Sequence, residues 1–364
     1  MDRNISKQAN DDKHSICIFL YIGPGWDPIT PEQGLKCFNS MSEKVNCHNE
    51  ADVLSCLRRV PQNDIIIHEF DIQEDVGTCW MAVFDSSYTD QPFLIGEPEE
   101  LLSSGQFNKV DVIIGTNLDE GIFSFFDKIA NPALWEDYKN NFDIIGPTML
   151  FGKNDITDLD VQKAHELLEF YVGGVENIDV EHQQGMIDMM TDSIFLYGTH
   201  RTIFHLANQG MDVFQYILTY HGQYSFTNAF GLPTVGVCHA DDLLYLFKPL
   251  GTYIIQYFLG SVNCKQNFKY FPQIGGMLNW NHPSYSEEEI AVRKTMVTSW
   301  TNFAKYGDPT PPNSDLTPWI PINAKNMQAQ ENYWNISGPV PEMSYSKYIE
   351  DRMNLWEHVL GVSN

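Results

Sequence analysis

A short apolar run followed at once by an acidic turn decides how this chain folds: Val110-Asp-Val-Ile-Ile-Gly-Thr-Asn-Leu-Asp-Glu-Gly121. The β-branched residues that end at Gly115 predict a strand buried on both faces. In an open α/β sheet, catalytic groups lie beyond the carboxyl ends of the strands, which is where Asp119 and Glu120 fall. Acidic residues at such a junction also cap helices, and spacing alone favours that plainer role.

Three more stretches have the length and composition of strands: residues 16–22, 213–220 and 333–336. Long segments with a helical pattern separate them. This alternation predicts an α/β fold, with a central, mostly parallel sheet flanked by helices. Four strands are few for 364 residues, so we expect a sheet whose N-terminal strands are missing.

The clearest helical signal begins at Ser286. The capping box Ser286-Glu-Glu-Glu289 predicts the start of the helix, and Gly307 followed by Pro309 predicts its end. Four residues of this helix are expected to share the buried face: Ile290, Val297, Trp300 and Ala304.

Two other helical regions are predicted. Residues 155–210 are largely helical, and residues 348–360, which contain Leu355, Trp356 and Val359, form a C-terminal helix. In the first region we expect one apolar cluster, made of Leu167, Leu168, Phe170 and Tyr171.

The charge of the chain excludes one class of partner. Twenty-two basic and 48 acidic side chains give a net charge of −26, a field that repels nucleic acid and anionic membranes. We therefore expect no nucleic-acid partner.

Charged residues make up only 19% of the chain, which predicts a folded protein except at its ends. Residues 1–15 are polar and expected to be disordered or non-native, and residues 16–360 to form one domain.

Signals for targeting and for metal binding are missing from the sequence. The apolar run at 16–22 is too short to span a membrane and lacks the layout of a signal peptide. The chain has seven cysteines, none in CxxC spacing, so we expect no metal site. Cys47 and Cys56 bracket a short polar loop that a disulfide could close, and the odd count leaves at least one thiol free.

A histidine follows the strand predicted at 213–220, within Gly236-Val-Cys-His-Ala-Asp-Asp242. A single histidine among eleven is by default a solvated or core imidazole. Its position after the acidic turn nevertheless matches the α/β-hydrolase order, in which the acid precedes the histidine and the serine precedes both. In such a triad the acid orients the imidazole, which takes the proton of the serine.

Five segments together resemble the type-B carboxylesterases, the cholinesterase family. The segment from Leu101 to Gly121 is similar to the acid-bearing segment of that family, and Gly236-Val-Cys-His-Ala-Asp-Asp-Leu-Leu-Tyr-Leu-Phe247 to its histidine segment. The other three segments are Val53-Leu-Ser-Cys-Leu-Arg-Arg-Val-Pro61, Trp300-Thr-Asn-Phe-Ala-Lys-Tyr-Gly-Asp-Pro309 and Tyr333-Trp-Asn-Ile336.

The resemblance implies an α/β-hydrolase fold and hydrolysis of small carboxylic esters without a cofactor. It places the triad acid at Glu120 and the triad base at His239, and it implies a disulfide between Cys47 and Cys56. A secreted or ER-lumen location is expected from the family. Residues 16–360 would be the C-terminal part of the carboxylesterase domain.

One family feature is absent from this sequence. The family nucleophile lies in G-x-S-x-G, and no serine here has glycines two residues before and two after it. Cys238 beside His239 is a poor substitute, because adjacent side chains seldom face each other. We therefore expect this chain alone to be inactive. It could be a truncated or spliced form of an esterase, a pseudoenzyme, or a relative of the neuroligin-like adhesion branch, which binds protein partners.

Two minor features are noted. Asn335-Ile-Ser337 and Asn4-Ile-Ser6 are glycosylation sequons. The aromatic residues Tyr224, Phe226 and Phe230 resemble the apolar wall of the family's substrate gorge, and a plain core role is equally expected.

The triad interpretation makes a geometric prediction. The strands at 110–115 and 213–220 must be neighbours in one parallel sheet, so that a Glu120 oxygen faces a ring nitrogen of His239 at roughly 2.6–3.2 Å. Asp119 should point elsewhere.

Overall fold

The computed structural model describes residues 29–76, 79, 89–153, 155–229, 232–233, 235–247, 285–325 and 332–362. The segment 1–15, the strand expected at 16–22, and the residues Asn4 and Phe230 lie outside these ranges.

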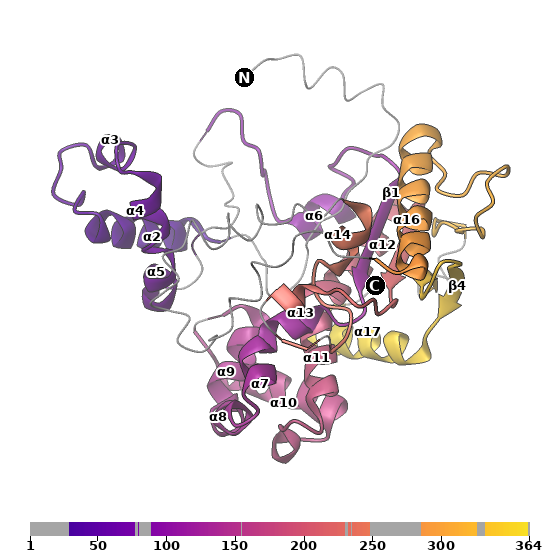
Figure 1. The fold of residues 1–364 in the computed structure, drawn as a ribbon. Helices are drawn as coiled ribbons and strands as arrows, with labels where there is room; N and C mark the ends of the chain where they lie inside the picture. Colours follow the sequence, from indigo (N-terminus) through magenta and orange to yellow (C-terminus); the bar gives the residue numbers. More distant parts are fainter. Residues whose placement is uncertain are drawn as a thin grey trace.

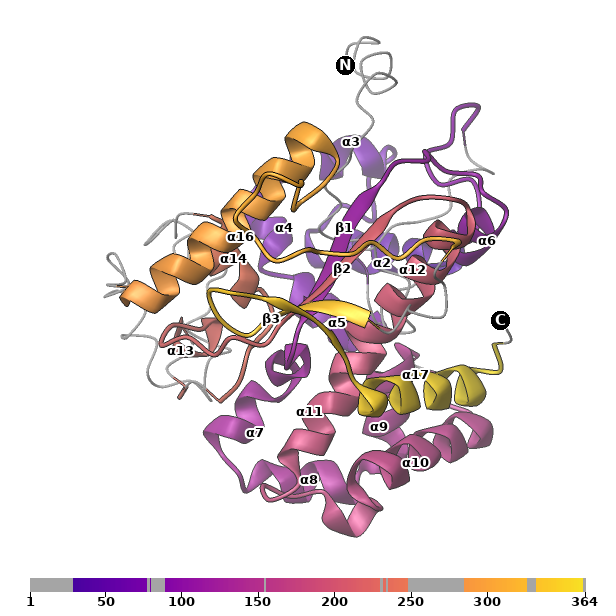
Figure 2. The ribbon, with the colours of Figure 1, turned by 90° about the vertical axis from the view of Figure 1, so that its right-hand side faces the viewer.

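The described strands form one mixed, four-stranded sheet (Figures 1 and 2). They lie side by side in the order β1 (Val112–Asn117), β2 (Val213–Leu218), β3 (Asn332–Ile336) and β4 (Glu342–Tyr345). The first two pairings are parallel and the last is antiparallel. β1, β2 and β3 fall where the sequence predicts strands. β4 was missed, because Glu342-Met-Ser-Tyr345 lacks the β-branched and aromatic run of a buried strand.

Two helices cover opposite faces of β1 and β2 (Figure 2). On one face, Ile113, Phe214 and Tyr216 pack in a cluster with residues of α16 (Glu287–Tyr306). On the other, Val112, Ile114 and Val213 pack in a cluster with residues of α12 (Tyr197–Asn208). Alternate residues of each strand thus point into two separate apolar layers, as expected for a strand buried on both faces.

The remaining helices lie before, between and after the strands. Near the N-terminus are α2 (Pro31–Lys44), α3 (Val53–Leu57), α4 (Gln62–Ile66), α5 (Glu69–Val76) and α6 (Pro98–Ser103). Between β1 and α12 are the 3₁₀ helix η1 (Glu120–Phe125), α7 (Phe126–Ala130), α8 (Leu134–Asn140), α9 (Phe142–Phe151), α10 (Asp158–Val172), the 3₁₀ helix η2 (Val175–Asn177), α11 (Gln183–Thr191) and the π-helical turn η3 (Asp192–Leu196). Beyond β2 are α13 (Phe226–Ala229), α14 (Asp241–Leu246) and, at the C-terminal end, α17 (Lys347–Leu360). No helix within the described residues is both long and apolar enough to cross a bilayer.

The prediction for α16 is right at its ends, but of the four residues predicted on its buried face only Trp300 is buried, and Ala304 is exposed. Ser286 and Glu289 form the expected capping box, and Gly307 ends the helix with a φ of 71°. Ile290 is 55% exposed, however, and Val297 is exposed as well, while Val292, Met296 and Phe303 are buried. The cause is Glu289, which is only 1% exposed because its carboxylate caps the helix and binds Gln223. Because Glu289 lies on the buried face, the apolar residues of that face do not form an uninterrupted helical pattern in the sequence.

The cluster predicted in α10 is correct for three of its four members. Leu167, Leu168 and Tyr171 are buried, whereas Phe170 is 42% exposed and stacks on Tyr348.

A buried ion pair ties α17 to the helical layer. Arg352 donates through Nε to Asp192 in η3 at 2.6 Å, and a second guanidinium nitrogen binds the other carboxylate oxygen. Tyr171 donates to the same carboxylate and accepts a hydrogen bond from Trp356. Burial raises the pKa of Asp192, and Arg352 opposes that rise.

Replacing Arg352 by Met should therefore destabilise the protein by about 3–5 kcal/mol, because Asp192 would keep its buried charge without its cationic partner. The matched control is Lys347→Met on the same helix, which removes exposed ion pairs with Glu350 and Asp351 and should leave the urea midpoint unchanged within error. Equal midpoints for both variants in urea unfolding would contradict the assignment.

Candidate active site

Two segments far apart in the sequence meet at the carboxyl end of the sheet. The parallel register pairs Asn117 at the end of β1 with Leu218 at the end of β2, so the two predicted strands are neighbours, as expected. The turn after β1 begins η1 with Glu120, and the loop that carries His239 crosses it, with the Asp119 N–H donating to the Val237 carbonyl at 3.0 Å.

Glu120 and His239 form the central contact of the site. Glu120 Oε2 lies 2.6 Å from His239 Nδ1, within the range expected from the sequence. The other carboxylate oxygen, Oε1, accepts the backbone N–H of Asn117 at 2.7 Å. Because Glu120 is only 5% exposed and both of its oxygens are bound, the imidazole is held through Nδ1 in a single orientation.

Burial and charge act on this pair in opposite directions. Burial raises the pKa of Glu120, and the hydrogen bonds from His239 and from the Asn117 N–H work against that rise. Burial by itself would lower the pKa of His239, but the adjacent Glu120 carboxylate outweighs it, and the pKa of His239 is raised. The ring therefore holds a proton more tightly than a free histidine does.

Two aromatic rings fix the plane of the imidazole. The ring centroids of Phe195 and Phe123 lie 4.7 and 5.3 Å from that of His239. Within the described part of the chain Nε2 has no hydrogen-bond partner, and the side chain of His239 is 34% exposed. Among the described residues, the imidazole therefore has one nitrogen bound to an acid and the other without a hydrogen-bond partner.

The loop around His239 is held by a buried acid and contains a strained residue. Ala240 has a φ of 68°, in the left-handed region that costs a non-glycine residue about 1–2 kcal/mol. Asp241 fixes the turn by accepting hydrogen bonds from the Cys238 N–H at 2.8 Å and the Phe226 N–H at 2.7 Å. Burial raises the pKa of Asp241 to about 7.

Sequence reasoning missed two supporting residues within the motifs it used. Asn117 donates through Nδ2 to the Cys238 carbonyl at 2.9 Å, which joins the acid turn to the histidine loop. Asp242 is 5% exposed and accepts a hydrogen bond from Tyr216 at 3.0 Å. The sequence signal that could have identified Asn117 and Asp242 is a polar side chain three residues from a catalytic candidate. Phe195, which is distant in sequence, left no signal of this kind.

Gly121 explains why a glycine follows the acid. A Cβ there would lie 2.3 Å from the Ile187 carbonyl oxygen, so no larger residue fits where η1 packs on α11. The Gly121 N–H donates to Thr191 Oγ1 at 2.9 Å across the same contact.

The five cysteines within the described ranges fall into two groups. The disulfide Cys47–Cys56 expected from the family resemblance is present, and a second bridge joins Cys37 to Cys79. Cys238 is a free thiol and fully buried, and burial raises its pKa well above its usual range. Because the thiolate is the reactive form, Cys238 is no substitute nucleophile.

The other candidate residues have structural surroundings. Asn335 lies in β3, and its Oδ1 accepts a hydrogen bond from Thr219 Oγ1 at 2.5 Å; glycosylation there stays a prediction. Tyr224 packs edge-on against Tyr285, and Phe226 packs against the core cluster on the α16 side of the sheet.

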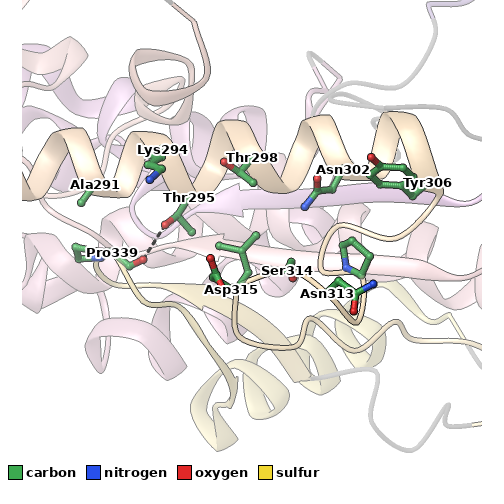
Figure 3. Close-up of a pocket in the computed structure, with 12 residues that line it drawn as sticks. Ala291, Lys294, Thr295, Thr298, Asn302, Tyr306, Asn313, Ser314, Asp315 and Pro339 are labelled. Atoms are coloured by element: carbon green, nitrogen blue, oxygen red, sulfur yellow. Dashed lines mark hydrogen bonds between the residues drawn. The ribbon is translucent and has the colours of Figure 1, made fainter.

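Within the described residues, the possible metal ligands and the groove beside α16 do not point to a second active site. In the described ranges no group of three or more His, Cys, Asp or Glu side chains could hold a metal ion. A groove of about 790 Å³ lies beside α16. Figure 3 shows side chains of α16 facing the loop at 311–316. Its lining includes Lys294, Asn302 and Asp315 but neither Glu120 nor His239, so it is separate from the catalytic candidates.

Comparison with known proteins shows the family of this chain. The model of the carboxylesterase family matches residues 27–356. The chain belongs to the carboxylesterase family. It is 28% identical over 292 residues to juvenile hormone esterase of Tribolium castaneum, an alignment that covers 76% of this chain and 45% of that protein. It is 20% identical over 317 residues to acetylcholinesterase of Bungarus fasciatus (83% and 44%) and 23% identical over 313 residues to human neuroligin-2 (83% and 32%).

The chain spans less than half the length of these curated relatives. Among solved structures, it resembles juvenile hormone esterase from Manduca sexta with OTFP covalently attached, with a TM-score of 0.66 and 19% identity over 92% of this chain and 57% of that one. The α/β-hydrolase fold predicted for this carboxylesterase-family chain is thereby confirmed.

Replacing Glu120 by Gln should lower the pKa of His239, because the neutral amide no longer stabilises the imidazolium. NMR titration of ¹³C-labelled histidine would measure it. Since the pKa of His239 is raised in the folded state, the stabilisation from its protonation is full below the ordinary histidine pKa of about 6.5 and is lost as the pH rises through the folded value. The E120Q variant should therefore lose more stability at pH 6 than at pH 9. An unchanged titration would refute the assigned contact.

Peptide mapping without reductant should recover Cys37 joined to Cys79 and Cys47 joined to Cys56. Cys238 should react with iodoacetamide only after unfolding, because its thiol is buried. Labelling of Cys238 in the native protein at the rate of an exposed thiol would contradict the structure.

Proposed function

We propose that this chain carries the acid–base part of a serine-type carboxylesterase site. His239 would act as general base and then as general acid, and Glu120 would orient it. The observation that carries the proposal is the 2.6 Å contact between a buried Glu120 oxygen and Nδ1, while no described residue hydrogen-bonds Nε2.

The chemistry follows from which nitrogen is bound. Because Nδ1 donates to Glu120, the lone pair of neutral His239 is on Nε2, which can take the proton of an attacking hydroxyl. The imidazolium that forms is stabilised by the carboxylate, and the proton is then delivered to the departing alcohol. The substrate would be a small carboxylic ester, the class named by the esterase relatives.

The nucleophile is the missing component, because no serine in the sequence has the G-x-S-x-G context. Loss of the nucleophile from such a triad lowers kcat by about 10⁶-fold. The two disulfides support folding in an oxidising, secretory compartment.

A second function is favoured by one comparison. The match to neuroligin-2 supports a non-catalytic role in which the fold binds a protein partner. That role does not require an ordered Glu120–His239 pair, so the preserved pair favours the esterase-derived site. Sequencing the 5′ end of the transcript would separate a shortened esterase from a pseudoenzyme.

The expressed chain should not hydrolyse phenyl or naphthyl esters above background and should not react with a fluorophosphonate probe, because the covalent route needs an activated serine. Hydrolysis rates and intact mass would test this, with a catalytically competent esterase as positive control. A stoichiometric adduct on any serine would refute the expected inactivity.

A further inference from the structure

We propose that Asp119, the acid beside Glu120, is a positioning residue that fixes the histidine loop against the acid turn, and that Gln184 of α11 holds Asp119 in place. The inference rests on the proposed function of the Glu120–His239 pair and adds a residue to it.

Asp119 binds the histidine loop in two directions. Its own N–H donates to the Val237 carbonyl at 3.0 Å, and its Oδ2 accepts the Val237 N–H at 2.9 Å. Asp119 is 6% exposed, so these bonds are shielded from water. Val237 stands two residues before His239, and Asp119 is adjacent to Glu120. The two hydrogen bonds between Asp119 and Val237 therefore lie directly beside the contact between Glu120 and His239.

The close approach requires a glycine in the loop. A Cβ on Gly236 would lie 2.5 Å from Asp119 Oδ2, a distance at which one of the two must move. Any larger residue at 236 would therefore displace either the loop or the Asp119 carboxylate and disturb the contact between them.

The second oxygen of Asp119 is held from another element. Gln184 donates through Nε2 to Asp119 Oδ1 at 2.8 Å and also lies 2.9 Å from Asp188 Oδ1. Both oxygens of Asp119 thus receive N–H donors, which an ionised carboxylate can satisfy and an asparagine amide cannot. The need for two acceptor oxygens explains why position 119 is an aspartate although its side chain does not bind the imidazole.

The position of His239 is consequently set by two anchors on the backbone that precedes it. Asp119 holds the backbone before the ring, and Asn117 holds the Cys238 carbonyl. Without Asp119 the loop would retain fewer anchors, and the contact between Glu120 and Nδ1 would lengthen or become intermittent. A weaker contact stabilises the imidazolium less.

A purely structural role makes a different prediction. If Asp119 only completes the turn, its loss would lower the melting temperature and leave the titration of His239 unchanged. The titration of His239 therefore distinguishes positioning from general stability.

The experiment is an NMR titration of the ¹³C-histidine-labelled chain, with His239 assigned from the signal lost in H239Q. The variants are D119A, Q184A and D111A. Asp111 is the matched control, because its Oδ1 accepts the Asp212 N–H at 2.9 Å at the opposite end of the same strand pair. We expect a lower His239 pKa in D119A, a smaller decrease in Q184A and no change in D111A. Exchange of the Val237 amide should become on the order of tenfold faster in D119A.

A double-mutant comparison tests the route of the effect. Adding D119A to E120Q should change the His239 titration no further, since the effect acts through the Glu120 contact. A folded D119A protein with wild-type titration would overturn the proposal. If D119A does not fold, the Q184A variant tests the proposal instead, because Gln184 is exposed and its replacement should not prevent folding. An unchanged His239 titration in Q184A would also overturn the proposal. A probe adduct on a serine would refute the proposed inactivity and leave this inference standing, so the two failures are distinguishable.

Discussion

The parallel pairing of β1 with β2 is the constraint on which the rest of the site depends. Its register brings the ends of the two strands to one edge of the sheet, and there Glu120 meets His239, 119 positions away in the sequence. A slip of one residue would exchange the two faces of the strand. Ile113 would then leave the α16 layer, and the turn after β1 would rotate away from the histidine loop. Core packing on both faces and the geometry of the site are therefore determined together.

The parts of the fold that depend on local chemistry could be predicted from the sequence. The β-branched runs locate β1 and β2, and the capping box at Ser286 locates the start of α16. The buried face of α16 could not be predicted, because Glu289 is buried to serve as a cap and disrupts the apolar pattern. The prediction that Phe170 is buried was wrong because an aromatic side chain can stack on a partner at the surface as well as enter the core.

The same division applies to the site. Glu120 and His239 stand in recognisable segments, and the order of those segments along the chain is informative. Phe195 packs on the imidazole from η3, and Cys37 bridges to Cys79 over 42 positions, and no local rule connects such residues. Tertiary packing alone selects these partners. The sequence can draw attention to a residue next to a catalytic candidate, as it does for Asp119. It cannot show which atom that residue binds, because the partner depends on how the acid turn and the histidine loop cross.

The charges around His239 bear on what the site is built to do. Glu120, Asp241 and Asp242 are each at most 5% exposed, and all three raise the pKa of His239. Among the described residues no lysine or arginine forms an ion pair with them, and their oxygens are bound instead by N–H and O–H donors and by the imidazole. Such an arrangement stabilises a protonated imidazole, which is the state a general base reaches after it takes a proton. A surface used only for adhesion would lose little if these buried acids became apolar, since buried charge seldom adds net stability. The buried acids, together with the strained Ala240 beside the ring, therefore fit acid–base chemistry better than a role in binding alone.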